Sequence, residues 1–200
     1  MGETAVTLPR RRFWVPLMLV VVFVVFAKFD VHYHIIGWFR GDAYYRGLPT
    51  TYWRDSAMLQ FKGLPPWRET LHRWTRMPLP VKEDRFPLFR GDPDAVPVLL
   101  QLATDQALDE DIRCYAIRGI AFPLDRLQGG LADDAKVVLQ RCLGDAKREI
   151  RFAAAQVLLR FDEDVETSAN VMLEIIRQQL KDASPNERIR ATSRLSILGH

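Results

Sequence analysis

The chain has 200 residues, enough for one domain or for one domain with an appendage. Apolar residues make up 48% of it and charged residues 26%, which excludes a globally disordered chain. Lys and Arg outnumber Asp and Glu by 14 to 7 in residues 1–90, but Asp and Glu outnumber Lys and Arg by 18 to 14 in residues 91–200. The two parts are therefore expected to have different surroundings.

Residues 1–39 indicate a basic tail followed by a membrane anchor. Three arginines at positions 10–12 precede fifteen uncharged residues, 13–27. As a helix this run spans about 22 Å, less than the ~30 Å hydrocarbon core, so Lys28 and the apolar residues after it must extend the segment into the interface. We predict a single-pass anchor over residues 13–29, with the rest of the chain on the extracytoplasmic (periplasmic) side.

A cleaved signal peptide is the alternative interpretation of the same segment. Its parts are a basic start, an apolar stretch and the ending "VFA" at residue 27. Cleavage there yields a secreted chain, which also lies outside the cytoplasm.

Residues 40–91 are predicted to form a juxtamembrane region of short helices and a linker. Thr50 or Thr51 can cap a helix that ends near Phe61, where Gly63 stops it. A second short helix with an apolar stripe follows Pro65 and Pro66, and residues 78–92 indicate a linker. Four aromatic residues alternate with arginines in this region: Tyr44, Tyr45, Tyr52 and Trp53. They form either a base-stacking, ligand or lipid-headgroup surface or a small aromatic core with arginines at its edge.

One sequence motif recurs three times in residues 92–200. The segments "DIRCYAIRGI", "EIRFAAAQVL" and "ERIRATSRLSI" place Arg113, Arg151 and Arg190 at separations of 38 and 39 residues. An isoleucine precedes each arginine, a small residue follows at +3 and a large aliphatic residue at +7, and these offsets share one helix face. Because an amphipathic helix precedes each phrase, we predict an all-α fold, a short α-solenoid of six helices in three antiparallel pairs. The preceding isoleucines are expected to be buried at equivalent positions: Ile112, Ile150 and Ile189.

Residues 92–200 resemble HEAT repeats, and the segments "GDPDAVPVLLQLATD" and "DEDIRCYAIRGI" of the first unit match best. Pro97 is expected to bend the first helix, because it lacks a backbone donor. The resemblance implies an acid–arginine ladder along the stacked turns. Its members are Asp111, Arg113, Glu149, Arg151 and Arg190. The third unit departs from the family pattern at Arg188. Nearly the whole chain resembles membrane-anchored bacterial HEAT-repeat proteins, in which a "YYRGLPTTYWRD"-like stretch precedes the repeats.

A stacked solenoid usually binds protein or peptide on its continuous surface. We therefore predict a non-enzymatic interaction or scaffold module, bound to another protein and to a membrane, without cofactor, metal or nucleic acid. His32 and His34 have no third metal ligand at readable spacing, and Cys114 and Cys142 are expected to be buried free thiols, with a disulfide as the alternative. The functional alternatives are a tetrapyrrole (bilin) lyase-type or other enzyme subunit, which some HEAT-like proteins are, and a purely structural module.

The partner is expected on the second helices of the repeats, which line the inner face of a HEAT stack. The positively charged middle region extends this surface, and the aromatic stretch of residues 44–53 is the alternative site. The candidate residues on the repeats are Arg118, Arg148, Gln156, Arg160 and Arg194. Their charges suit an acidic or mixed-charge protein segment.

Overall fold

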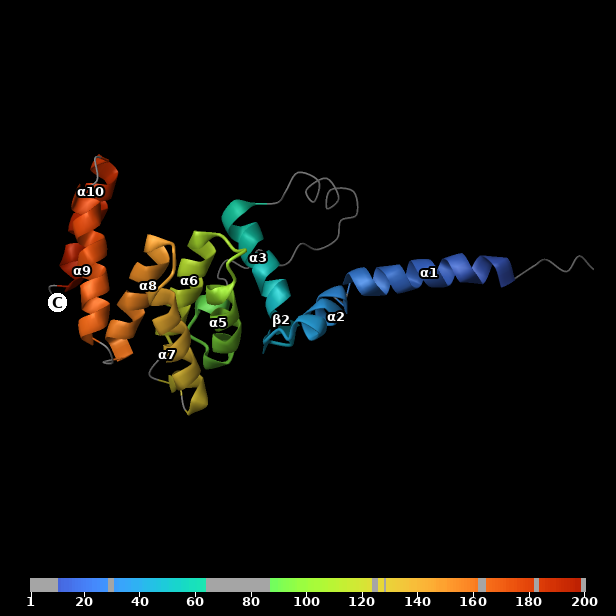
Figure 1. The fold of residues 1–200 in the computed structure, drawn as a ribbon. Helices are drawn as coiled ribbons and strands as arrows, with labels where there is room; N and C mark the ends of the chain where they lie inside the picture. Colours follow the sequence, from blue (N-terminus) through green and yellow to red (C-terminus); the bar gives the residue numbers. More distant parts are fainter. Residues whose placement is uncertain are drawn as a thin grey trace, which may run out of the picture.

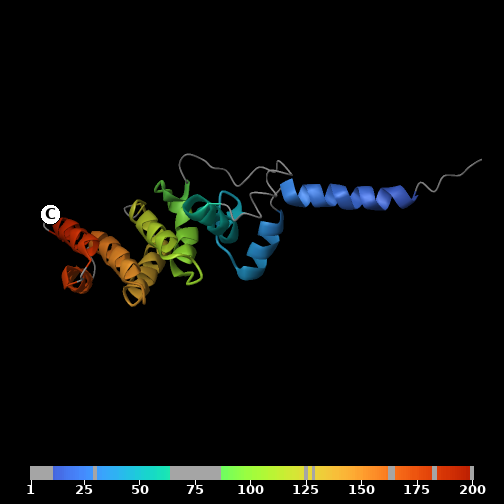
Figure 2. The same cartoon turned by 90° about the horizontal axis from the view of Figure 1, so that it is seen from above.

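The computed structural model describes residues 11–28, 31–63, 87–123, 126–127, 129–161, 165–181 and 184–198. These residues are predominantly helical, and the prediction of an all-α fold is confirmed at that level. The helices follow one another along an elongated molecule, with α1 at one end and the pair α9 and α10 at the other (Figures 1 and 2). The predicted helix around residues 67–74 lies outside the described residues.

Helix α1 (Arg11–Lys28) projects away from the remaining helices in both views (Figures 1 and 2). Its 18 residues include Pro16 and three cations, at positions 11, 12 and 28. Eight large apolar side chains between residues 14 and 22 are exposed. Among the described residues, no helix combines the length and the apolar character needed to cross a membrane.

Helices α2 (Val31–Arg40) and α3 (Thr50–Lys62) flank a two-stranded antiparallel ribbon, β1 (Tyr44–Tyr45) and β2 (Leu48–Pro49). Arg46 and Gly47 have φ values of 51° and 74°, which suits a tight two-residue hairpin turn. Gly37 lets α2 approach the ribbon, because a Cβ there would lie 2.5 Å from the Pro49 Cβ.

The predicted helix of the middle region is confirmed, but its cap is not. Gly63 ends α3 with a φ of 76°, as expected. Neither Thr50 nor Thr51 caps the helix with its side chain, since the N-cap residue is Pro49. The Asp42 carboxylate instead accepts the Thr51 backbone N–H at 2.7 Å. A carboxylate from the preceding loop thus satisfies a free donor of the first turn.

Six α-helices fill residues 92–200, as predicted, and the described part of that span contains no strand. They are α5 (Val96–Thr104), α6 (Glu110–Ala121), α7 (Gly130–Leu143), α8 (Arg148–Leu158), α9 (Val165–Lys181) and α10 (Pro185–Leu198). Short 3₁₀ turns lie at Pro87–Phe89, at Pro93–Ala95 and at Leu159–Phe161. Asp92 and Asp109 cap with their side chains. Pro97 lies in the first turn of α5, where backbone N–H groups have no acceptor within the helix. Its missing N–H therefore breaks no helical hydrogen bond, and the predicted bend in the helix is wrong.

Helices α5 and α6, α7 and α8, and α9 and α10 pack as pairs, and these pairs meet through α6 against α8, α5 against α7 and α8 against α9. One hydrophobic cluster runs from Tyr33 on α2 to Leu158 on α8. A second, smaller cluster joins Phe152 of α8 to α9 and to Ala191 of α10. The array therefore has two cores that meet at α8.

The burial of Ile112 and Ile150 is confirmed, since neither side chain is accessible. The prediction for Ile189 is wrong, because its side chain is 65% exposed. Helix α10 turns Ala191 and Arg194 inward instead. Position +4 after the repeat arginine holds a buried residue in α6 and α8, and in α10 it holds Arg194. A charged residue at a core position requires polar partners, and these determine how α10 is oriented.

The acid–arginine ladder implied by the HEAT resemblance takes another form. Arg113 is buried, and its Nε donates to the Ala103 carbonyl at 2.9 Å while its Nη2 pairs with Asp145 at 2.6 Å. The Asp145 carbonyl accepts from Arg151 Nη1 at 2.8 Å. Asp111, in contrast, is exposed. The residue that links Arg113 to Arg151 is therefore Asp145, in the turn between α7 and α8, rather than an acid at the start of α6.

Candidate partner-binding surface

Three of the four candidate aromatic residues of the middle region form a small core. Tyr45, Tyr52 and Trp53 are buried, with Tyr45 and Trp53 ring centroids 5.4 Å apart. The Trp53 Nε1 donates to the carbonyls of Tyr45 and Leu48, both at 3.2 Å. Only Tyr44 is exposed. The structure thus favours the aromatic-core interpretation for these residues.

Tyr45 also ties this core to the helical array. Its hydroxyl donates to Asp92 Oδ2 at 2.9 Å, next to the 3₁₀ turn that leads into α5. Burial raises the pKa of Tyr45, and the hydrogen bond to the Asp92 carboxylate raises it further. The Arg46 guanidinium lies 5.3 Å from the centre of the Tyr45 ring. This geometry matches an arginine at the edge of an aromatic core.

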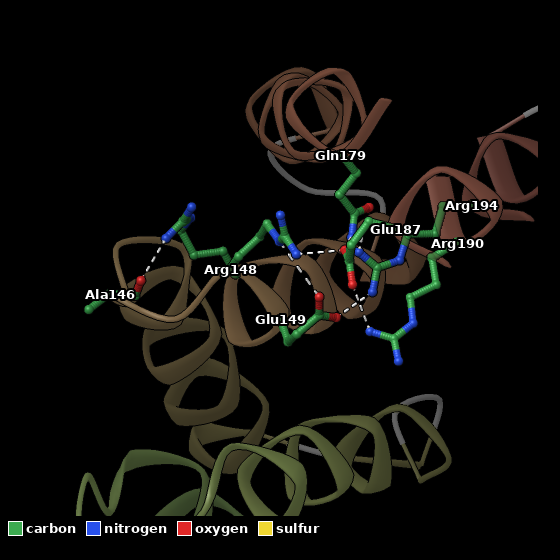
Figure 3. A network of polar contacts seen from close by, with 8 residues as sticks. Ala146, Arg148, Glu149, Gln179, Glu187, Arg190 and Arg194 are labelled. Carbon is green, nitrogen blue, oxygen red and sulfur yellow. Dashed lines mark hydrogen bonds and ion pairs between the residues drawn. The ribbon is translucent and has the colours of Figure 1, made fainter. Parts of the chain in front are cut away.

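Two of the candidate arginines, Arg148 and Arg194, belong to a polar network that joins α8, α9 and α10 (Figure 3). Arg148 Nη2 donates to Glu187 Oε2 at 2.7 Å, and Gln179 Nε2 donates to the same oxygen at 2.9 Å. Arg190 pairs with the other oxygen of Glu187 at 3.0 Å. One carboxylate of α10 therefore collects donors from three helices.

Arg194 is the most enclosed cation of this network, with 13% of its side chain exposed. It pairs with Glu149 of α8, and its Nη1 donates to Gln179 Oε1 at 2.9 Å. Its guanidinium lies 4.1 Å from the centre of the Phe152 ring. Through these contacts Arg194 holds α10 against α8 and α9. Little of its side chain remains accessible to a partner.

The remaining candidates lie on the surface of α6 and at the end of α8. Arg118 on α6 and Arg160 in the 3₁₀ turn Leu159–Phe161 are exposed, whereas Gln156 on α8 is half-buried. Of the five candidate residues of the repeats, the structure joins Arg148 and Arg194 in one polar network.

Arg118 lies on the same helical face as Tyr115 and Phe122, at spacings of three and four residues. Tyr115 contacts aromatic rings from two other segments: its ring centroid lies 4.6 Å from that of Phe61 and 6.0 Å from that of Phe89. We call Phe61, Phe89, Tyr115, Arg118 and Phe122 the aromatic–basic patch. Tyr115 and Phe122 are 45% and 65% exposed.

Two glycines shape this patch. A Cβ on Gly119 would lie 2.9 Å from Phe89 Cδ1, so the glycine lets the Phe89 ring lie on α6. Gly91 has a φ of 77°, and a Cβ there would lie 2.9 Å from the Phe122 Cβ. The recurrence of Tyr115, Arg118 and Phe122 on one helix face was a readable sequence signal, but the contributions of Phe61 and Phe89 depend on the tertiary fold.

Both cysteines are free and buried, so the prediction of free thiols is confirmed. Burial raises the pKa of Cys114 to about 12, and burial also raises the pKa of Cys142. A thiol with such a pKa is almost entirely protonated at neutral pH, which disfavours its use as a nucleophile.

A groove of about 370 Å³ lies between the α5–α6 and α7–α8 turns. Its lining includes the Arg113–Asp145 ion pair and the exposed cations Arg141 and Lys147. Within the described ranges, no three His, Cys, Asp or Glu side chains are grouped so that they could hold a metal ion. His34 stacks on Tyr44 with ring centroids 5.9 Å apart, and His32 lies against Tyr33.

No protein-family model, curated protein or solved structure matches this chain.

Proposed function

We propose that the chain is a non-enzymatic interaction module in which residues 92–200 form a short HEAT-like α-solenoid that binds another protein. Support for the solenoid comes from the serial packing of α5 to α10 and from the equivalent burial of Ile112 and Ile150 in α6 and α8. Such arrays expose a continuous surface suited to extended partners.

The aromatic–basic patch is the observation that carries this proposal. Tyr and Arg are enriched among residues that dominate binding energy, and large exposed aromatic groups mark interaction sites. Tyr115 and Phe122 supply apolar area beside the exposed Arg118 guanidinium, with Phe61 and Phe89 supporting the Tyr115 ring. A protein segment that combines apolar and acidic side chains matches this chemistry.

We further propose that residues 13–29 tether the module to a membrane, with the repeats on the extracytoplasmic side. The supporting observation is that α1 exposes eight large apolar side chains between residues 14 and 22 and has cations at both ends. At about 27 Å, the 18-residue helix is shorter than the ~30 Å hydrocarbon core, so the tether depends on the cations at its ends reaching toward the headgroups. Secretion after cleavage near residue 27 is the alternative.

Capture of the partner from solubilised membranes tests the patch. The bait is the full chain, and the variant combines Tyr115→Ala with Arg118→Glu. Arg177→Glu, an exposed cation on α9, makes the same charge change as Arg118→Glu away from the patch. We expect the double variant to keep its helical circular dichroism and to lose at least tenfold in captured partner, while the control retains capture.

Salt provides a second readout, since the contribution of Arg118 is screened as the Debye length falls from about 8 Å at physiological ionic strength to about 3 Å at 1 M. Capture of the same protein by the double variant at undiminished yield would place the partner elsewhere on the chain.

A further inference from the structure

Helix α2 is attached to the folded body through one face. Tyr33 and Gly37 are its buried residues. The Tyr33 hydroxyl donates to Asp55 Oδ2 on α3 at 2.9 Å, and the Tyr33 ring meets the Tyr52 ring edge-on at 5.3 Å. Gly37 lies against Pro49 of the ribbon. The inner face of α2 is therefore packed as a core face.

The loop that follows α2 is held by the array itself. Gln101 on α5 accepts the Ala43 backbone N–H at 2.8 Å and donates to the Gly41 carbonyl at 3.1 Å. These bonds connect α2 to α5 as well as to α3. If α2 binds a surface, α3 and α5 are therefore oriented relative to that surface as well.

The outer face of α2 is apolar and uncovered in the described structure. Its exposed large apolar residues are Ile35, Ile36, Trp38 and Phe39, of which Trp38 is 74% and Phe39 77% exposed. At 100° per residue, Ile35, Trp38 and Phe39 fall together opposite Tyr33 and Gly37, and Ile36 and the exposed His32 lie at the flank of this face. This reverses the usual amphipathic arrangement, in which the solvent face is polar.

The chain around this face has a small excess of cations. Residues 28–46, from the end of α1 to the hairpin turn, contain three Lys or Arg and two Asp. Arg40 at the end of α2 and Arg46 in the hairpin turn are exposed, whereas the Asp42 carboxylate is engaged with Thr51. A helix with Trp and Phe on one side and cations beside them is suited to an anionic bilayer surface, where the rings enter the headgroup layer.

Position along the chain strengthens this assignment. Lys28 ends α1 and Val31 begins α2, so three Cα–Cα steps separate them, at most about 11 Å. If α1 is held by the membrane, the start of α2 lies within that distance of the interface.

We propose that α2 is a docking foot that lies in the headgroup layer of an anionic bilayer, with Ile35, Ile36, Trp38 and Phe39 inserted. This inference rests on the proposed membrane tether. It adds that the array is oriented on the membrane rather than free to swing on α1, because the inner face of α2 is fixed to α3, the ribbon and α5. The aromatic–basic patch then has a fixed orientation relative to the bilayer.

The test places an environment-sensitive fluorophore on Phe39→Cys in the full chain, with Gln60→Cys as the matched control. Gln60 is exposed on α3 and has no role in the foot. The native thiols are buried, and the unsubstituted chain treated with the same dye corrects for any labelling of them. Vesicles of four parts phosphatidylcholine to one part phosphatidylglycerol are compared with phosphatidylcholine alone and with brominated lipid.

We expect both labelled chains to float with the vesicles. The label at position 39 should shift to the blue and be quenched by brominated lipid, more strongly with the anionic lipid, while the label at position 60 keeps its aqueous spectrum. Flotation with an aqueous spectrum at both positions overturns the docking foot and leaves the tether standing. Absence of flotation overturns the tether and the foot together. A concentration-dependent blue shift without vesicles assigns the face to a second copy and also overturns the foot.

Discussion

The Asp145 carboxylate joins three segments of the helical array. Its Oδ2 accepts from Arg113 Nη2 at 2.6 Å, and its Oδ1 accepts the Lys147 backbone N–H at 2.8 Å. The Asp145 carbonyl accepts from Arg151. Burial by itself raises the pKa of Asp145, but the hydrogen bonds from Arg113 and Lys147 and the charges of Arg113 and Arg151 outweigh it and hold the pKa below its usual value.

Replacing Asp145 by Ala should therefore lower the stability in a pH-dependent way. At pH 7 the loss leaves the buried Arg113 without its acid, at a cost of about 3–5 kcal/mol. Because the folded pKa is depressed, this stabilisation is present above the unfolded value of about 3.9 and is lost as the pH falls through the folded pKa. Urea unfolding from pH 7 down to pH 2 measures the difference between the two chains.

Asp134→Ala, at an exposed carboxylate of α7, serves as the control and should stay within about 0.5 kcal/mol of the unsubstituted chain. A difference between Asp145→Ala and the unsubstituted chain that persists unchanged to pH 2 would contradict the assigned ion pair.

Ile150 and Ile189 stand at the same place in their repeats but differ in burial. Ile150→Ala should cost about 2–5 kcal/mol, because it opens a cavity in the larger cluster. Ile189→Ala should change the stability by less than about 0.5 kcal/mol, because the side chain is largely exposed. Denaturant midpoints of the two variants measure this. Equal losses would mean that α10 has the register of α6 and α8 after all.

At the scale of elements, α10 is held by charged groups where α6 and α8 are held by apolar ones. Arg194 occupies the place that Ile117 and Ala155 occupy in the earlier repeats, and it is matched by Glu149 and Gln179. A charged residue at a core position is tolerated only with such partners. The polar network in Figure 3 therefore substitutes for part of the core.

Removing Arg194 should loosen α10 selectively. Arg194→Ala removes the donor to Glu149 Oε2 and to Gln179 Oε1, although Glu149 keeps its ion pair with Arg148. The loss should cost about 2 kcal/mol, which speeds amide exchange in α10 roughly 30-fold. Arg190→Ala removes an exposed i,i+3 pair with Glu187 and should have little effect. Hydrogen exchange resolved by peptide measures both. Equal exchange in the two variants would show that the network does not hold the helix.

At the scale of the whole molecule, the two hydrophobic clusters predict two steps of opening. The larger cluster spans α2 to α8, whereas the smaller one holds only α9 and α10 to α8. Helical arrays are stabilised repeat by repeat, so the last hairpin can open while the rest stays folded.

Native-state exchange should therefore show lower protection in α9 and α10 than in α5 to α8. Phe152→Ala removes the main contact of α8 in the smaller cluster and should lower protection of α9 and α10 further, with a smaller effect on α5 and α6. Uniform protection across all six helices would mean that they open as one unit.

The sequence by itself determined the helices of residues 92–200. Their apolar stripes and the caps at Asp92 and Asp109 depend on neighbours within one or two turns, so local spacing identifies them. The burial of Ile112 and Ile150 followed from the same periodicity, because each helix is flanked on both sides by others.

A further copy of the repeat motif, on α3, is recognised only from the tertiary structure. Trp53, Arg54 and Ala57 on α3 match the large–Arg–small spacing, and Arg54 pairs with Asp105 at 3.3 Å as Arg113 pairs with Asp145. This copy is hard to recognise in the sequence because aromatic residues stand where the other copies have aliphatic ones. The pairing appears only when the turn between α5 and α6 lies beside α3.

The tertiary structure also decided the face that α10 turns inward and the partner that each long side chain finds. Among the described residues no helix covers the far side of α10, so Ile189 is exposed although its spacing matches that of Ile150. The aromatic–basic patch joins Phe61 and Phe89 to Tyr115 across three segments. Periodicity specifies which residues share a face, but what covers that face depends on segments far away in the sequence.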